Sequence, residues 1–186
     1  MSVQYAKHLF TVQEYERMAE AGVFPPEARL ELLAGEIVEM SPIGKRHVAC
    51  VNRLSRILNR QVDETVIVST QNPIQLDDLS EPQPDIALLK FRSDFYEHSL
   101  PTPADVLLVV EVADTTLDYD RGLKLSNYAR AGIPEALIFN LPDEQLEYHA
   151  QPAGGAYQTT RILRRGEHLH SSGVPDLMFD VAAVLG

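Results

Sequence analysis

The chain has 186 residues, a hydrophobic fraction of 45% and a formal net charge of −11 at pH 7. This length and composition predict a single domain over residues 1–186 with an ordinary packed core. The one cysteine, Cys50, excludes an internal disulfide, and its apolar helical surroundings favour a small core residue over a reactive thiol. No apolar run reaches the roughly 18 residues of a membrane span, and the N-terminus lacks a basic-then-apolar signal, so we expect a cytoplasmic protein without membrane contact.

The acidic net charge argues against a nucleic-acid partner, because contacts to phosphate dominate such affinity. It does not exclude a nucleic-acid partner, because a negative net charge is compatible with local basic patches on the surface. Basic residues gather in two places: Lys45, Arg46, Arg53, Arg56 and Arg60, and then Arg161, Arg164 and Arg165. The first group falls on an expected helix, where a solvated polar face is the simpler explanation. Charge alone therefore leaves the substrate open.

The N-terminal third predicts two helices with a hairpin between them. Thr11 and Glu14 have the spacing of a capping box, which indicates a short helix over residues 11–21. The segment RLELLAGEIVEMSP alternates around Ala34-Gly35 and indicates a hairpin or the beginning of a strand. Residues 43–61 form a long amphipathic helix by their apolar spacing, with apolar positions at Val48, Val51, Leu54, Ile57 and Leu58.

The rest of the chain predicts mostly strands, interrupted by one helix. Strands are expected at 66–70, 73–76, 84–90, 105–113, 135–140, 145–151 and 156–163. The near-continuous apolar run ADVLLVVEVA is typical of a central strand covered on both faces. A helix over residues 119–131 is stopped by Gly132 and Pro134. The fold class is thus α/β or α+β: a mixed β-sheet flanked by helices, with additional antiparallel hairpins.

Asp85, Glu111 and Lys124 are the most informative residues. Asp85 opens one apolar strand, Glu111 lies near the end of another, and Lys124 lies on the helix that follows. A buried carboxylate is costly unless a cation meets it, and two carboxylates about 4 Å apart repel by roughly 4 kcal/mol at an effective dielectric near 20. A divalent ion, helped by a lysine, removes that cost. The pattern favours a magnesium-dependent phosphodiesterase site.

Long segments of the chain resemble the Uma-type restriction endonuclease family of bacteria, within the PD-(D/E)xK nuclease superfamily. They are ELLAGEIVEMSPIGKRH, EPQPDIALLK, LLVVEVADTTLDYDRGLKLSNYARAGIPEALIFN and the closing hairpins, and together they cover nearly the whole chain. The resemblance implies a restriction endonuclease-like core. In the superfamily the second carboxylate and the lysine usually share one strand. Here that lysine position is Ala113, and the cation comes from Lys124 instead.

The resemblance implies roles for these residues. Asp85 and Glu111 would bind Mg²⁺, or Mn²⁺, with the Val112 carbonyl as a further ligand. Lys124 would orient a metal-bound water or offset charge on the phosphoryl oxygens, since an unperturbed lysine is a poor general base. The competing interpretation pairs Lys124 with Asp120, one turn before it, on the helix surface. Asp120 could also orient Lys124 from behind the site.

Four other residues are weaker candidates. Glu31 matches the N-terminal acidic residue that joins the metal site in related nucleases, with a solvated carboxylate as the equal alternative. His47 could contact a phosphate or act in acid-base chemistry, although a lone helix histidine is more often structural. Gln71 could reach the site from a neighbouring strand. Tyr128, one turn beyond Lys124, is expected to pack in the core behind the site.

The expected function is that of a magnesium-dependent endonuclease that hydrolyses DNA phosphodiester bonds and works as a homodimer, because a duplex has two strands to cut. The alternative is a non-catalytic binding or assembly module that keeps the fold, which the acidic charge and the missing strand lysine favour. Hydrolysis of RNA or of a small nucleotide is a third, weaker alternative. No serine or cysteine nucleophile motif, zinc spacing or phosphate-binding glycine loop competes with these.

Overall fold

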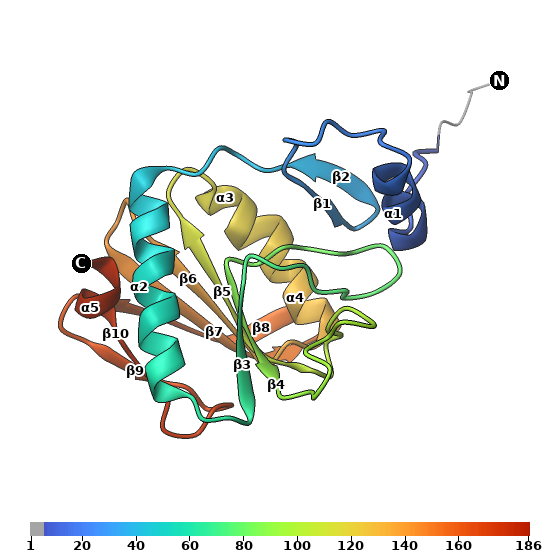
Figure 1. Ribbon diagram of the computed structural model, residues 1–186. Coiled ribbons are helices and arrows are strands. Elements are labelled where there is room, and N and C mark those ends of the chain that lie inside the picture. Colours follow the sequence, from blue (N-terminus) through green and yellow to red (C-terminus); the bar gives the residue numbers. More distant parts are fainter. Residues whose placement is uncertain (1–5) are drawn as a thin grey trace.

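A mixed six-stranded sheet is the centre of the computed structural model, which describes residues 6–186 (Figure 1). Its strands are β3 (Val66–Thr70), β4 (Ile86–Lys90), β5 (Val106–Ala113), β6 (Glu135–Asn140), β7 (Gln145–Ala153) and β8 (Ala156–Arg164). They lie side by side in chain order, and every neighbouring pair is antiparallel except β5 and β6. The mixed sheet flanked by helices that the sequence predicts is confirmed.

The strand directions bring Asp85 and Glu111 to one edge of the sheet. Because β4 and β5 are antiparallel, the beginning of β4 lies beside the end of β5, and Ile86 pairs with Val110. Asp85 comes directly before β4, and Glu111 directly follows Val110, the last residue of β5 that pairs with β4. Two carboxylates that are 26 positions apart in the chain therefore meet where the ladder between these strands ends.

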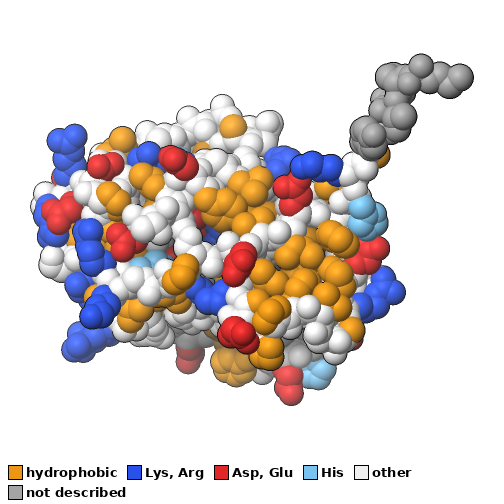
Figure 2. Space-filling model, turned by 90° about the horizontal axis from the view of Figure 1, so that it is seen from above, with side chains coloured by type: hydrophobic (Ala, Val, Ile, Leu, Met, Phe, Trp, Pro, Cys, Tyr) orange, Lys and Arg blue, Asp and Glu red, His pale blue; other side chains and the backbone are white. Residues whose placement is uncertain are grey.

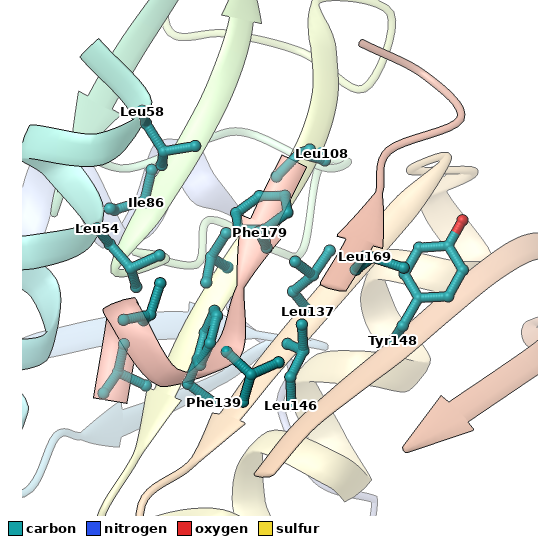
Figure 3. Packing of buried hydrophobic residues seen from close by; sticks show 14 of the residues in the cluster. Leu54, Leu58, Ile86, Leu108, Leu137, Phe139, Leu146, Tyr148, Leu169 and Phe179 are labelled. Atoms are coloured by element: carbon teal, nitrogen blue, oxygen red, sulfur yellow. The ribbon is translucent and has the colours of Figure 1, made fainter. Parts of the chain in front are cut away.

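Helices cover both faces of the sheet. They are α1 (Val12–Glu20), α2 (Lys45–Gln61), α3 (Leu117–Tyr119), the π-helical turn η1 (Asp120–Lys124), α4 (Leu125–Ala131) and α5 (Val181–Leu185). On one face α2 and α5 pack over the larger core, which includes Leu54, Leu108, Phe139 and Phe179 (Figure 3). On the other face Tyr128 of α4 packs in the smaller core. The two cores fix the sheet between the helices that carry His47 and Lys124.

Two small hairpins complete the fold. The first pairs β1 (Leu30–Leu33) with β2 (Glu36–Glu39) across the turn Ala34-Gly35, as the sequence predicts. The second pairs β9 (His168–His170) with β10 (Met178–Asp180). The first hairpin is tied to the body of the fold because Leu32 and Glu81 exchange backbone hydrogen bonds.

The expected strand over residues 73–76 is wrong. The backbone of this segment bonds to scattered carbonyls rather than to one strand: Ile74 to Pro82, Leu76 to Ser80 and Gln75 to Pro101. Pro73 and the prolines near Asp85 lack the N–H groups that a ladder needs, so the apolar side chains are buried in a loop.

The expected helix over residues 119–131 exists but is not a regular α-helix. It begins at Leu117, passes through the π turn Asp120–Lys124 and ends at Gly132, whose φ of 79° is the left-handed conformation that glycine adopts readily. The apolar spacing indicated a helix but not the extra residue of the π turn. The capping box of Thr11 and Glu14 is present as predicted.

Among residues 6–186, no helix is both long and apolar enough to cross a membrane.

Glu81 makes the stability of the fold depend on pH. Its side chain is buried, its Oε2 has no hydrogen-bond partner among residues 6–186, and burial raises the pKa of its carboxyl to about 7. Between its ordinary pKa of 4.5 and about 7, the carboxyl is neutral in the folded protein but ionised in the unfolded chain. The stability that this difference provides is therefore lost as pH rises from about 4.5 to about 7.

We expect Glu81→Gln to be more stable than the wild type at pH 8 but not at pH 4.5. After allowance for solvent screening, the relative gain between the two pH values is about 1–2 kcal/mol. Urea unfolding of both proteins at each pH measures it. The exposed Glu20→Gln is the control, and its free energy should differ from that of the wild type by less than about 0.5 kcal/mol at either pH. A Glu81→Gln difference that does not change with pH would contradict the assignment.

Candidate functional site

A cavity of about 450 Å³ opens at the sheet edge where β4 begins and β5 ends. Its lining comes from β1, β2 and the segment that leads to α2, from the ends of β3 and β5, and from α3 and η1. Asp85, Glu111, Lys124, Glu31, Val112, His47, Gln71 and Asp120 all line it. The fold thus brings together eight of the nine residues that the sequence singled out, and the ninth, Tyr128, lies directly behind them.

Asp85 is held by three hydrogen bonds. Its Oδ2 lies 2.9 Å from Nε2 of His47 and accepts the backbone N–H of Val112 at 2.8 Å, while its Oδ1 accepts from Nε2 of Gln71 at 3.2 Å. Burial opposes ionisation of this carboxyl, but the bonds from His47 and Val112 keep its pKa below the ordinary value. Asp85 is therefore an ionised, oriented carboxylate.

Glu111 lies deeper, on the opposite face of β5 from Val112. Its Oε1 accepts from the Tyr128 hydroxyl at 2.6 Å and from Lys124 Nζ at 3.1 Å, and its Oε2 lies 3.3 Å from the same Nζ. Burial raises the pKa of the Glu111 carboxyl to about 8 in spite of the neighbouring Lys124 ammonium. Tyr128, expected as core packing, both packs in the core and orients this carboxyl.

Lys124 is the cation among these carboxylates. Its side chain is only 5% exposed, and its Nζ lies 3.3 Å from Glu31 Oε2 and 3.3 Å from the Gln83 carbonyl in addition to its contacts with Glu111. Burial opposes its charge, but Glu111, Glu31 and the carboxylates around them raise its pKa above the ordinary value. The group stays an ammonium at neutral pH.

The alternative in which Lys124 pairs with Asp120 on the helix surface is wrong. Both side chains are buried, and the Lys124 ion pairs are with Glu31 and Glu111. Asp120 instead accepts from the Thr116 hydroxyl at 2.6 Å, and burial raises the pKa of its carboxyl. Asp120 acts on Lys124 through its charge and forms no ion pair with it.

Glu31 belongs to the same cluster, and the alternative of a solvated carboxylate is wrong. The side chain is 1% exposed on β1, Oε1 accepts from the Tyr119 hydroxyl at 2.9 Å, and Oε2 accepts from the Gln83 backbone N–H at 2.9 Å. Tyr119 and Gln83 were not expected at the site. Tyr119 stands in the long segment that resembles the Uma-type family, but its spacing does not show which way the ring points.

The donor atoms fit Mg²⁺, although they do not form a complete cage. Asp85 and Glu111 supply carboxylate oxygens. The N–H of Val112 faces Asp85, and a strand residue presents its N–H and C=O to the same side, so the Val112 carbonyl also faces this edge. Within residues 6–186 no group of three or more His, Cys, Asp or Glu is arranged as a metal site. Mg²⁺ commonly takes one or two carboxylates and completes its shell with water and substrate, which this donor set allows.

Comparison with known proteins identifies a family and a similar solved structure, both of which are described as nucleases. A crystal structure of "a putative nuclease belonging to DUF820" from Anabaena variabilis superimposes with a TM-score of 0.73 at 12% identity, over 95% of this chain and 97% of that one. At this identity the likeness shows the fold. No curated protein matches the chain. The Uma2 family, described as "Putative restriction endonuclease", matches residues 12–182, and the chain belongs to that family.

Replacing Lys124 should destabilise the fold strongly. Lys124→Met leaves Glu31 and Glu111 buried without their cation, and we expect a loss of about 3 kcal/mol in the free energy of unfolding at pH 8. Arg121→Met on the same π turn is the matched control. Arg121 is 40% exposed, and its partner Glu147 keeps a hydrogen bond from Asn140, so a loss of about 1 kcal/mol is expected. Chemical denaturation measures both, and equal losses would show that the Lys124 ion pairs are unimportant.

Proposed function

We propose that this protein is a metal-dependent endonuclease that hydrolyses DNA phosphodiester bonds. One observation carries the proposal: an ionised carboxylate, a second carboxyl with a raised pKa and a buried ammonium converge in one cavity at the end of a central strand. Groups whose pKa values are displaced by burial and by specific partners gather at functional sites more often than elsewhere. The family description and the nuclease fold support the same class.

Asp85, Glu111 and the Val112 carbonyl would hold Mg²⁺ or Mn²⁺, which when bound makes a coordinated water more acidic and offsets negative charge on phosphorus. Asp85 is already oriented by His47 and the Val112 N–H. Lys124 stays an ammonium, so it serves as a fixed positive charge toward the phosphoryl oxygens and not as a general base.

The remaining residues position these groups. Glu31 forms an ion pair with Lys124, and hydrogen bonds from the Tyr119 hydroxyl and the Gln83 backbone N–H orient the Glu31 carboxylate. His47 bonds Asp85 through Nε2, while its Nδ1 has no partner in the described structure. His47 and Gln71 both line the cavity, and we assign these two residues to contact with substrate. A homodimer, with one copy of the site in each protomer, belongs to the same proposal.

A non-catalytic module is the second candidate, and one observation favours it. Lys124 already compensates Glu31 and Glu111, so the buried carboxylates can exist without any metal. On this alternative the cavity binds a partner or ligand and performs no reaction. Metal binding and cleavage distinguish the two candidates.

Isothermal titration with Mg²⁺ and Mn²⁺ tests the metal site first. We expect the wild type to bind and Asp85→Asn to lose at least about tenfold in affinity, because the ionised ligand is gone. The matched control is Asp118→Asn, an exposed carboxylate that also lines the cavity and should leave affinity unchanged. Equal binding by the wild type and Asp85→Asn would refute the assignment of Asp85.

Cleavage of labelled DNA with Mg²⁺ or Mn²⁺ tests the activity. Asp85→Asn and Glu111→Gln should each lower the rate by at least about 100-fold, since the proposed electrostatic stabilisation depends on both carboxylates. Asp118→Asn should cleave like the wild type. A wild type that binds metal but cleaves no DNA would favour the non-catalytic module.

A further inference from the structure

The reacting groups lie at the bottom of the cavity and not on an exposed surface. Glu31, Glu111 and Lys124 are all buried, and Asp85 is nearly so. A phosphate that is to meet them must enter the cavity, whose volume of about 450 Å³ is within the roughly 300–1,000 Å³ range of small-ligand sites. A paired nucleotide brings its partner base and stacked neighbours with it, and these do not fit in such a volume.

The cavity has an apolar wall besides its charged one. Val38 of β2 lines the cavity, and so do Met40, Pro42 and Ile43 from the segment between β2 and α2. Ile43 is 39% exposed. The same cavity therefore offers a surface for a flat apolar group together with cationic and acidic groups for a phosphate and its metal. Enzymes that take up an unstacked nucleotide hold its base between apolar or aromatic side chains in this way.

The charge of the cavity also disfavours a paired duplex. Two cationic side chains, Arg29 and Lys124, line it against seven acidic ones: Glu31, Glu39, Asp85, Glu111, Asp114, Asp118 and Asp120. Viewed from above, the protein shows hydrophobic side chains and scattered acidic ones over the centre of the face, with most Lys and Arg at its margins (Figure 2). A duplex carries two phosphates per base pair, so an unpaired strand brings fewer charges against this surface.

We infer that the cavity accepts one unpaired nucleotide, so that the protein acts on single-stranded or locally unpaired DNA in preference to paired duplex. The phosphate meets the carboxylates and Lys124, and the base lies against the apolar wall of Met40 and Ile43. This inference rests on the proposed function for its reaction, but its binding preference can be measured without any cleavage.

Three labelled DNA molecules of one sequence test it: a single strand, the paired duplex, and a duplex with a central unpaired bubble. With Mn²⁺ we expect the single strand and the bubble to be cleaved at least about tenfold faster than the duplex, with bubble cuts inside the unpaired region. A duplex cleaved as fast as the single strand would overturn the inference while leaving the nuclease proposal intact.

Fluorescence anisotropy separates the two proposals if nothing is cleaved. In that case the proposed nuclease activity fails, and binding of the same three DNA molecules, measured with Ca²⁺, decides the inference. Binding of the single strand at least about tenfold tighter than the duplex upholds it. Equal binding, or no binding of any of the three, overturns it.

Ile43→Ala and Val48→Ala form a matched pair for the apolar wall. Both side chains are exposed, at 39% and 44%, but only Ile43 lines the cavity. We expect Ile43→Ala to weaken single-strand binding about 5-fold and Val48→Ala to change it less than twofold, with Mn²⁺ affinity unchanged in both. Equal effects of the two substitutions on single-strand binding would overturn the assignment of the base to this wall.

Discussion

The Lys124 ammonium is the interaction on which the site depends. It lies between Glu31 of the first hairpin and Glu111 of the central strand, which are 80 positions apart in the chain, and all three side chains are buried. Removing one partner of a buried ion pair costs far more than the pair contributes, because the remaining charge stays desolvated. The cluster therefore holds the hairpin, the sheet and the following helix in one arrangement, and the cavity is shaped by that arrangement.

The same constraint explains why Asp85 and Glu111 differ although both are acidic. Asp85 lies where the β4–β5 ladder ends, so the free Val112 N–H and the His47 ring stabilise its charge. Glu111 receives a hydroxyl and an ammonium but lies deeper, and burial prevails. Two carboxyls with displaced and opposite pKa shifts in one cavity are the arrangement in which acid–base and metal-binding roles divide.

The sequence predicted most of the helices and strands and a mixed sheet, but not the order of the strands in it. Strong apolar runs at β4, β5 and β6 and the spacing of α2 were sufficient to locate those elements, and the long motif around Glu111 indicated the family. The sequence also predicted that Asp85 and Glu111 belong to the site, because a charged residue at the end of a buried strand needs a partner. The prediction of a strand over residues 73–76 is wrong because an apolar run does not distinguish a buried strand from a buried loop. Prolines remove the backbone N–H groups that a strand would need there. Tyr119 and Gln83 were missed because their contacts depend on the backbone path, which periodicity does not encode.

The π turn has a consequence for how the helix tolerates a change in length beside the site. Tyr119 and Lys124 both reach Glu31, yet five residues of a regular α-helix would place their side chains about 140° apart. The wider turn of Asp120–Lys124 brings them onto one side, and it contains Gly122, where an added Cβ would meet no atom within 4 Å. Deleting that one codon would leave the two residues four positions apart, and a regular α-helix places such a pair only about 40° apart, so Tyr119 and Lys124 would stay on the side that faces Glu31. The π turn is thus equivalent to a one-residue insertion that the helix absorbs without changing which side chains meet Glu31.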